Sequence, residues 1–217
     1  MVHKLEVDSI ILEFGHHRVL QDVYFTSETG KITGILGRNG CGKSCLMNII
    51  YGVLPATDKS IRIDGKPIFD GYRDPQLFRY LPQFNFIPKD FTVRRIFSDF
   101  GLDFASFINW FPEFEKFHQR KLGKLSGGER RIVEVYAILA AKTKFCMLDE
   151  PFSHIMPLHV EVLKNIMLEE KKNKGVIITD HMHRYITEIS DHLYVITNGK
   201  AHLTKEADDL KRLGYLH

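Results

Sequence analysis

The stretch Gly37-Arg38-Asn39-Gly40-Cys41-Gly42-Lys43-Ser44 decides the fold of this 217-residue chain. It fits the phosphate-loop pattern GxxxxGK[ST] and lies between the apolar run 31–36 and the helical pattern 43–51. Its glycines let backbone N–H groups approach phosphate oxygens without a Cβ clash. Lys43 supplies positive charge for the β- and γ-phosphates, and Ser44 supplies a hydroxyl for Mg²⁺. The stretch therefore predicts a nucleotide-phosphate site at the start of a helix.

Two adjacent carboxylates, Asp149 and Glu150, follow the apolar run 145–148. Because side chains alternate along a strand, these two point different ways and can take separate roles. Asp149 would belong to the Mg²⁺ coordination sphere, and Glu150 would polarise an attacking water. Alone, a strand that ends in Asp-Glu is more often a capping or turn device. About 100 residues after a phosphate loop, it indicates the second half of a nucleotide site.

A second anion-seeking helix start is predicted at Leu125-Ser126-Gly127-Gly128-Glu129. Ser126 and Glu129 have the spacing of a capping box, so an ordinary helix start is one interpretation. Capping alone does not require Gly127 and Gly128, which lower helix propensity but leave the first amides open to an anion. Both interpretations stay open at this point.

Composition narrows the classes to which the chain can belong. With 44% hydrophobic and 26% charged residues, it suits one compact domain and excludes disordered, collagen-like and disulfide-scaffold classes. A net charge of +3 is too weak to indicate nucleic acid as a partner. The three cysteines have no metal-ligand or CxxC spacing, which favours free thiols in a reducing compartment. No apolar run approaches membrane-spanning length and no signal-peptide pattern occurs, so we expect a soluble, cytosolic chain.

Hydrophobic patterning predicts an α/β fold with an antiparallel start and a helical insertion at about residues 84–124. Predicted strands and hairpins cover residues 2–14, 22–26, 31–36, 61–69 (turning at Asp64-Gly65), 145–148, 176–179, 194–197 and 200–204. Predicted helices cover residues 43–51, 92–117 (in two pieces interrupted near Pro112), 126–141 and 205–213, and a helical pattern follows each of the runs 145–148 and 176–179.

These motifs together resemble the ATP-binding cassette (ABC) ATPase family over nearly the whole chain. The motifs on which this resemblance rests are LSGGE (125–129), the phosphate loop and MLDEP (147–151). The resemblance implies a single domain over residues 1–217: a P-loop NTPase core with a mixed sheet and an N-terminal antiparallel β subdomain. A small helical subdomain, about residues 84–124, would be inserted in this RecA-like core. The activity it implies is hydrolysis of ATP with Mg²⁺.

The resemblance also implies roles for single residues. Gln83 matches the glutamine loop, His181 matches the switch histidine that contacts the γ-phosphate, and Phe14 matches the aromatic that stacks on adenine. Candidate nucleotide contacts are Phe14, Gly37, Asn39, Gly40, Cys41, Gly42, Lys43, Ser44, Cys45, Gln83, Ser126, Gly127 and Gly128. Candidate catalytic residues are Lys43, Gln83, Glu150 and His181. Candidate metal ligands are Ser44, Gln83 and Asp149.

The family pattern further implies a head-to-tail dimer of two cassettes, here a homodimer, in which Ser126 of one subunit closes on the ATP of the other. The two cassettes would drive an integral membrane permease. Binding to this partner would hold the chain at the inner face of the cell membrane. Single-cassette subunits of lipopolysaccharide export and branched-chain amino-acid uptake are the most similar types. A soluble non-transport ABC ATPase and a weakly hydrolysing ATP switch are the alternatives.

Two features depart from the family. Met156 stands where a loop aspartate usually communicates across the dimer, which fits either benign variation or altered coupling of the two ATP sites. Residues 84–117 hold ten of the 16 phenylalanines and the only tryptophan. Phe104, Phe107, Ile108 and Phe111 recur at helical spacing. Most of these rings are expected in a core, and a minority in a groove that receives a permease helix.

Overall fold

A computed structural model describes residues 1–204 and 207–215. The strands are β1 (Lys4–Phe14), β2 (His17–Glu28), β3 (Ile32–Gly37), β4 (Asp58–Ile63), β5 (Lys66–Pro67), β6 (Phe78–Leu81), β7 (Phe145–Asp149), β8 (Gly175–Thr179), β9 (His192–Thr197) and β10 (Lys200–Thr204). The helices are α1 (Lys43–Tyr51), α2 (Val93–Asp99), α3 (Phe104–Trp110), α4 (Gly127–Ala140), α5 (Pro157–Glu170), α6 (His183–Ile189) and α7 (Ala207–Arg212). Three short 3-10 turns are η1 (Gly71–Arg73), η2 (Pro112–Phe117) and η3 (Leu122–Lys124).

The strands form two sheets, which confirms the predicted α/β fold with an antiparallel start. The order of the larger sheet is β10-β9-β3-β8-β7-β6, with parallel pairing from β9 to β6 and antiparallel β10 at the edge. The smaller sheet, β2-β1-β4-β5, is antiparallel throughout. Strands β3, β7 and β8 are buried at every residue, as expected for parallel strands covered on both faces.

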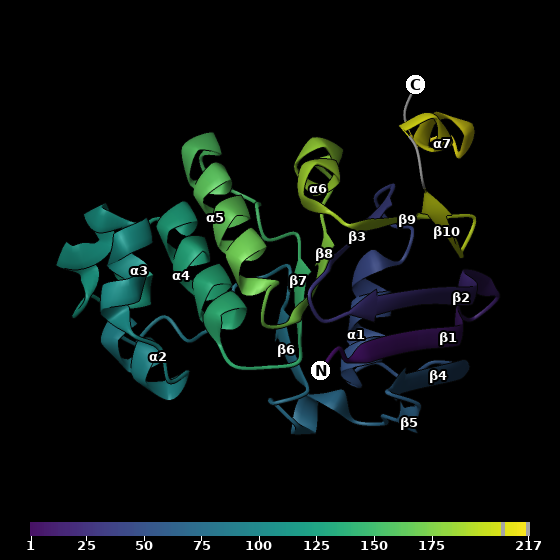
Figure 1. Cartoon of the computed structure of the whole chain (residues 1–217), viewed down its shortest axis with the longest axis horizontal. Coiled ribbons are helices and arrows are strands. Elements are labelled where there is room, and N and C mark those ends of the chain that lie inside the picture. Colours follow the sequence, from purple (N-terminus) through teal and green to yellow (C-terminus); the bar gives the residue numbers. More distant parts are fainter. Residues whose placement is uncertain (205–206, 216–217) are drawn as a thin grey trace.

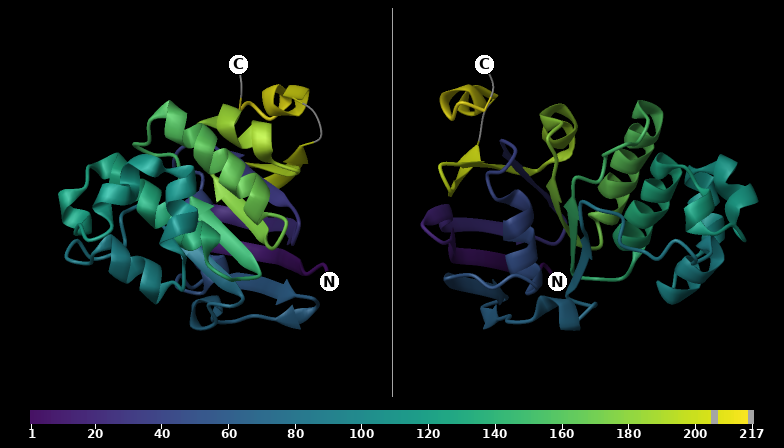
Figure 2. Two further views of the ribbon diagram at one scale, coloured as in Figure 1. Left: turned by 60° about the vertical axis from the view of Figure 1, so that its left-hand side comes forward. Right: turned by 180° about the vertical axis from the view of Figure 1, so that it is seen from behind.

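Two hydrophobic cores lie on opposite faces of the larger sheet. Helices α4, α5 and α6 cover one face, and α1 with the antiparallel sheet covers the other (Figure 1; Figure 2). The first core continues into the α2–α3 region, whose rings pack against Tyr136 of α4. The stacking of Phe97 on Tyr136, with ring centroids 5.8 Å apart, joins this region to the sheet-covering helices.

The aromatic segment 84–117 is mostly core, as predicted. Five phenylalanine rings are buried (Phe97, Phe107, Phe111, Phe114 and Phe117), and four more pack against the same core (Phe86, Phe91, Phe100 and Phe104). Phe84 and Trp110 are the exposed members, at 71% and 37%. The exposed ring of Phe84 directly follows Gln83 in the chain.

Some elements and breaks were not predicted, for local reasons. The predicted interruption near Pro112 is present, since α3 ends at Trp110 and Pro112 begins a 3-10 turn. The earlier break at residues 100–103, where Gly101 has φ +64°, was not predicted. Strand β6 was not predicted, because four residues at a sheet edge leave too short a hydrophobic pattern. The last predicted helix, 205–213, is α7, and its first two residues lie outside the described ones. Within the described residues, no helix has both the length and the apolar character needed to cross a membrane.

Candidate active site

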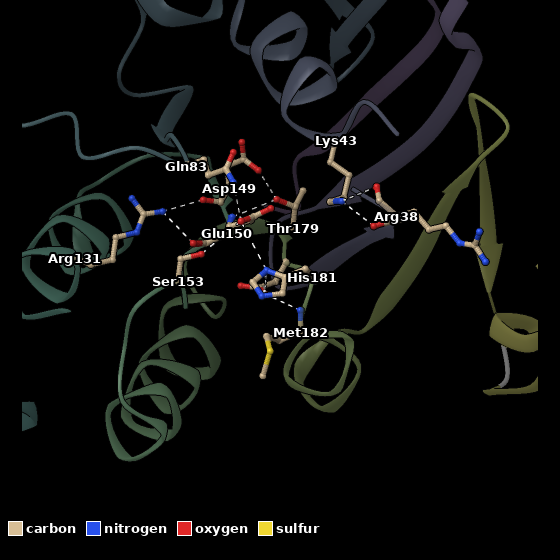
Figure 3. A network of polar contacts seen from close by, with 12 residues as sticks. Arg38, Lys43, Gln83, Arg131, Asp149, Glu150, Ser153, Thr179, His181 and Met182 are labelled. Atoms are coloured by element: carbon tan, nitrogen blue, oxygen red, sulfur yellow. Dashed lines mark hydrogen bonds and ion pairs between the residues drawn. The ribbon is translucent and has the colours of Figure 1, made fainter. Parts of the chain in front are cut away.

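Parallel pairing brings the predicted site segments to one edge of the larger sheet. The phosphate loop follows β3, Gln83 follows β6, Asp149 ends β7, and His181 follows β8. Since parallel strands all end at the same edge, segments far apart in the sequence meet there. Figure 3 shows this arrangement, with Lys43 opposite the carboxylate and histidine segments.

The phosphate loop turns through two left-handed glycines, Gly40 at φ +80° and Gly42 at φ +101°. Only glycine adopts such angles without strain. Lys43 is buried and donates hydrogen bonds from Nζ to the carbonyl oxygens of Gly37 (2.7 Å) and Arg38 (3.3 Å). A Cβ at Gly37 would lie 2.4 Å from Sγ of Cys41, so the loop closes tightly there. These hydrogen bonds hold the Lys43 ammonium within the phosphate loop.

A cavity of about 660 Å³ opens in front of this loop. Ten predicted site residues line it: Phe14, Asn39, Gly40, Gly42, Lys43, Ser44, Cys45, Gln83, Glu150 and His181. His17 and Val19 of strand β2, which were not predicted, complete the wall. One cavity wall therefore includes an aromatic ring, from Phe14, together with a phosphate loop and a carboxylate.

Asp149 is buried beneath the cavity rather than in its wall. Its Oδ1 accepts a hydrogen bond from the Thr179 hydroxyl (2.6 Å), and its Oδ2 accepts one from the Tyr80 hydroxyl (3.3 Å). Burial and the charge of Asp149 raise the pKa of Tyr80, so this phenol stays a donor. Two neutral donors thus fix the carboxylate and leave its remaining lone pairs for a ligand.

Glu150 points the other way, as the strand alternation predicts. Its backbone is left-handed at φ +47°, and its amide donates to the carbonyl oxygen of Thr179 (2.9 Å). Its Oε2 accepts a hydrogen bond from Nε2 of Gln83 (2.9 Å), and Nδ1 of His181 lies 3.7 Å from the same oxygen. Side chains from two other strand ends therefore converge on one carboxylate oxygen of Glu150.

The structure does not bring Ser126, Gly127 and Gly128 into this cavity. Ser126 and Gly128 line a separate cavity of about 360 Å³, together with His154 and Met156. The capping box is present: Ser126 Oγ accepts from the amide of Glu129 (3.3 Å), and Glu129 Oε2 accepts from that of Ser126 (2.7 Å). The Ser126 segment therefore faces solvent away from the phosphate loop of its own chain.

Two further predicted contacts, Gly37 and Cys41, do not line the phosphate-loop cavity. Cys41 lines a third cavity of about 270 Å³ with Arg38 and residues 213–215. Burial raises the pKa of the Cys41 thiol against the lowering effect of nearby Lys43, and burial with the charge of Asp149 raises that of Cys45. Neither thiol is set up as a nucleophile, because a reactive cysteine needs a lowered pKa.

Known proteins show where this geometry belongs. A family model described as "ABC transporter" matches residues 20–153. The lipopolysaccharide export system ATP-binding protein LptB of Haemophilus influenzae is 32% identical over 220 residues, covering 90% of this chain and 88% of the relative. LptB of Escherichia coli K12 is 34% identical over 200 residues, covering 84% and 82%. The chain belongs to the ABC transporter family.

Solved structures agree with the fold. The ATP-binding subunit of an ABC transporter superposes with a TM-score of 0.82 at 23% identity, covering 97% of this chain and 93% of that one. A nucleotide-free ATP-binding cassette superposes with a TM-score of 0.78 at 25% identity, covering 97% and 94%. The chain is thus an ATP-binding, ATP-hydrolysing subunit of an ABC transporter, working with separate membrane components, as the sequence predicted.

Sequence reasoning missed the residues that hold the site residues in place. Thr179 and Tyr80 hold Asp149, and Arg131 of α4 donates to the backbone of residues 82, 149 and 150. Arg131 carries a signal in retrospect, because a charged residue on the buried face of an amphipathic helix requires a partner.

Proposed function

We propose that this chain works as one half of a head-to-tail homodimer that binds two ATP molecules and drives a separate membrane permease. The observation that carries the proposal is the separation of two anion-seeking helix starts within one chain. Lys43 and Ser44 line one cavity, whereas Ser126 lines another. Residues that serve the same nucleotide from different cavities need a second subunit, and a head-to-tail pair supplies it.

In this proposal the phosphate loop and Phe14 bind the nucleotide. The backbone amides of residues 37–45 surround the phosphates, and Lys43 transfers its two carbonyl hydrogen bonds to phosphate oxygens. Phe14 is half exposed and lines the same cavity, where its ring can stack on adenine. Ser126, Gly127 and Gly128 of the partner subunit close over the γ-phosphate.

Glu150 is the proposed general base. Its carboxylate lies in the cavity wall, held by Gln83, and accepts a proton from the water that attacks the γ-phosphorus. His181 is half exposed beside it and donates to the oxygens on which negative charge develops. The P–O bond to ADP then breaks, and phosphate leaves with the oxygen of the water.

The residues present fit a magnesium ion. Ser44, Gln83 and Asp149 offer only oxygen ligands, with one carboxylate among them. The described residues hold no cluster of three or more His, Cys, Asp and Glu side chains that would cage a metal without a nucleotide. Mg²⁺ takes few protein ligands and completes its shell with water and substrate phosphates. When bound, the ion neutralises charge on the β- and γ-phosphates.

The proposal places the chain at the cytoplasmic face of the cell membrane, held there by the permease. Residues 84–124 would act as the helical subdomain of a single domain over residues 1–217. The exposed ring of Phe84, next to Gln83, supports a permease contact beside the site. The LptB relatives support a stand-alone cassette that assembles with membrane components.

Turnover measured against protein concentration tests the dimer. We expect ATP turnover per subunit to fall on dilution, and a Glu150→Gln variant to elute as a dimer with ATP and as a monomer without it. Lys43→Ala is the control that should stay monomeric under both conditions. Constant turnover per subunit at high dilution, with no trapped dimer, would sink the proposal. A wild-type chain that dimerises with ATP but releases no phosphate favours the ATP-switch alternative.

Co-purification from detergent extract tests the permease. We expect a multi-span membrane protein to accompany the chain, and a Phe84→Ala variant to lose it while keeping ATP turnover. Recovery of the chain alone from membranes and from cytosol, with full turnover, contradicts a membrane load and favours a soluble non-transport ATPase.

A further inference from the structure

A buried guanidinium links helix α4 to the active-site backbone. Arg131 lies five residues after Ser126 and is only 3% exposed. Its Nη1 donates to the carbonyl oxygen of Pro82 (2.9 Å), and its Nη2 donates to those of Asp149 (2.9 Å) and Glu150 (3.1 Å). Figure 3 shows the Arg131 side chain pointing at the Asp149–Glu150 backbone. One side chain thus contacts the segments that carry Gln83 and Glu150.

The chemistry of this contact favours positioning over simple charge pairing. Burial lowers the pKa of Arg131, and the surrounding carboxylates of Glu134, Asp149, Glu150 and Asp180 oppose this effect. Its hydrogen bonds nonetheless go to carbonyl oxygens rather than to those carboxylates. A planar guanidinium has donors in a fixed geometry, so bonds to three carbonyls set the relative positions of two backbone segments.

Glu150 needs such a restraint. Its left-handed backbone, φ +47°, costs roughly 1 kcal/mol or more for a residue other than glycine. Thr179 holds its amide and Arg131 holds its carbonyl oxygen, so the strained peptide is bound on both sides. The same guanidinium binds the carbonyl of Pro82, directly before the amide donor Gln83. The 2.9 Å contact between Gln83 and Glu150 therefore depends on where Arg131 lies.

The other end of the link is the start of helix α4. The capping box fixes Ser126 to the first turn, and Arg131 follows one turn later on the buried face of the same helix. A helix moves as a rigid element, so a shift of the Ser126 end displaces the guanidinium against all three carbonyls.

We propose that Arg131 is a positioning residue that couples the N-terminus of helix α4 to the carboxylate of Glu150. The proposal rests on the proposed function, since it takes Glu150 as the general base. Closure of the partner subunit on Ser126 moves α4, and Arg131 carries that movement to the backbone of Glu150. The base is then aligned only when both subunits enclose ATP.

The test separates turnover from binding. Arg131→Lys keeps the cation but cannot span three carbonyls, so we expect kcat to fall about ten- to a hundredfold. The Kd of a fluorescent ATP analogue and the thermal unfolding midpoint should stay close to those of the wild type. Arg130→Lys is the matched control with unchanged kcat, because Arg130 is also buried in α4 but binds Glu134 and the carbonyl of Ile87 instead.

Two further measurements distinguish a loss of positioning by Arg131 from a folding defect of the variant. In a Glu150→Gln background, Arg131→Lys should cause no further loss of turnover, because it acts through that carboxylate. In R131A, millimolar guanidinium should restore part of kcat, whereas in R130A it should not.

The outcomes distinguish the two claims. An Arg131→Lys variant with kcat within twofold of the wild type, beside a Glu150→Gln variant whose residual kcat is far below that of the wild type, overturns the coupling alone. So does an equal loss in both backgrounds. A Glu150→Gln variant that turns over as fast as the wild type overturns the assignment of the base, and the coupling with it.

Discussion

Nε2 of Gln83 donates a 2.9 Å hydrogen bond to Oε2 of Glu150, across 67 positions of the sequence. The two residues reach each other because β6 and β7 are parallel neighbours whose carboxyl ends coincide, with Leu81 opposite Leu148. The same Oε2 lies 3.7 Å from Nδ1 of His181, which follows β8. A side-chain amide therefore fixes the rotamer of the carboxylate that the proposed mechanism uses as a base.

Removal of the Gln83 amide should slow hydrolysis more than it weakens binding. A hydrogen bond to a charged group contributes about 1.5–3 kcal/mol, so Gln83→Ala should lower kcat by about tenfold or more. The Kd for ATP without Mg²⁺ should change little, since the phosphate loop remains intact. Single-turnover phosphate release and equilibrium binding separate the two effects. A loss of affinity with unchanged kcat would assign Gln83 to binding only.

Lys43 should control affinity instead. Its ammonium is buried within the loop and already donates to two carbonyl oxygens, so little reordering is needed when a phosphate arrives. Loss of charge-assisted hydrogen bonds in Lys43→Ala should weaken ATP binding by about ten- to a hundredfold or more. Isothermal titration measures this. Lys43→Ala with wild-type ATP affinity would contradict the placement of phosphates in this loop.

Motifs with strict spacing predicted the cavity wall, because their chemistry needs given residue types at given positions. The phosphate loop, Glu150 and the α/β class all follow from such local patterns. Contacts that depend on the order of the strands in the sheet could not be predicted from the sequence. Nothing near Tyr80 in the sequence indicates that its hydroxyl meets Asp149, since that contact follows from the pairing of β6 with β7.

Short or interrupted helices and strands were also not predicted correctly from the sequence. Strand β6 has four residues, and its pattern cannot be told from a loop. In the 92–117 segment, Pro112 drew the predicted break, yet Gly101 ends the first helix earlier. Glycine at a positive φ and proline at the first position of a turn leave similar sequence signals, and packing decides between them.

Met156→Asp should stabilise the chain. Met156 is the N-cap of α5 with extended backbone angles, makes no capping hydrogen bond, and is 62% exposed. Pro157 has no amide hydrogen, and the amide of His159 already donates to the carbonyl oxygen of Met156 (2.9 Å). Aspartate at this N-cap would therefore accept from the amide of Leu158 and contribute about 0.5–2 kcal/mol. Urea unfolding should show this gain, and Met156→Ala should not. An unchanged or lower free energy of unfolding would show that the cap geometry is not available to a carboxylate.

Cys45 should react slowly with alkylating agents at neutral pH. Burial and the charge of Asp149 raise its pKa above the ordinary thiol value, so less thiolate exists at pH 7.5 than in a free cysteine. The rate should keep rising with pH beyond the point at which a free thiol levels off. ATP should slow the alkylation of Cys45, which lines the cavity. In unfolded protein, ATP should leave the alkylation rate unchanged. Mass spectrometry of a Cys41→Ala variant follows this thiol; faster labelling than free cysteine contradicts the raised pKa.

Phe107 and Phe84 should differ sharply when truncated, although both belong to the same aromatic segment. Phe107 is fully buried, and the centroid of its ring lies within about 6 Å of those of five others: Phe97, Phe104, Phe111, Phe114 and Tyr136. Phe107→Ala should lower the free energy of unfolding by about 3–5 kcal/mol, because the site loses both burial and packing. Phe84→Ala should change it by less than about 0.5 kcal/mol. Urea denaturation of both variants compares them, and similar losses would mean that the Phe84 ring is covered within the folded chain.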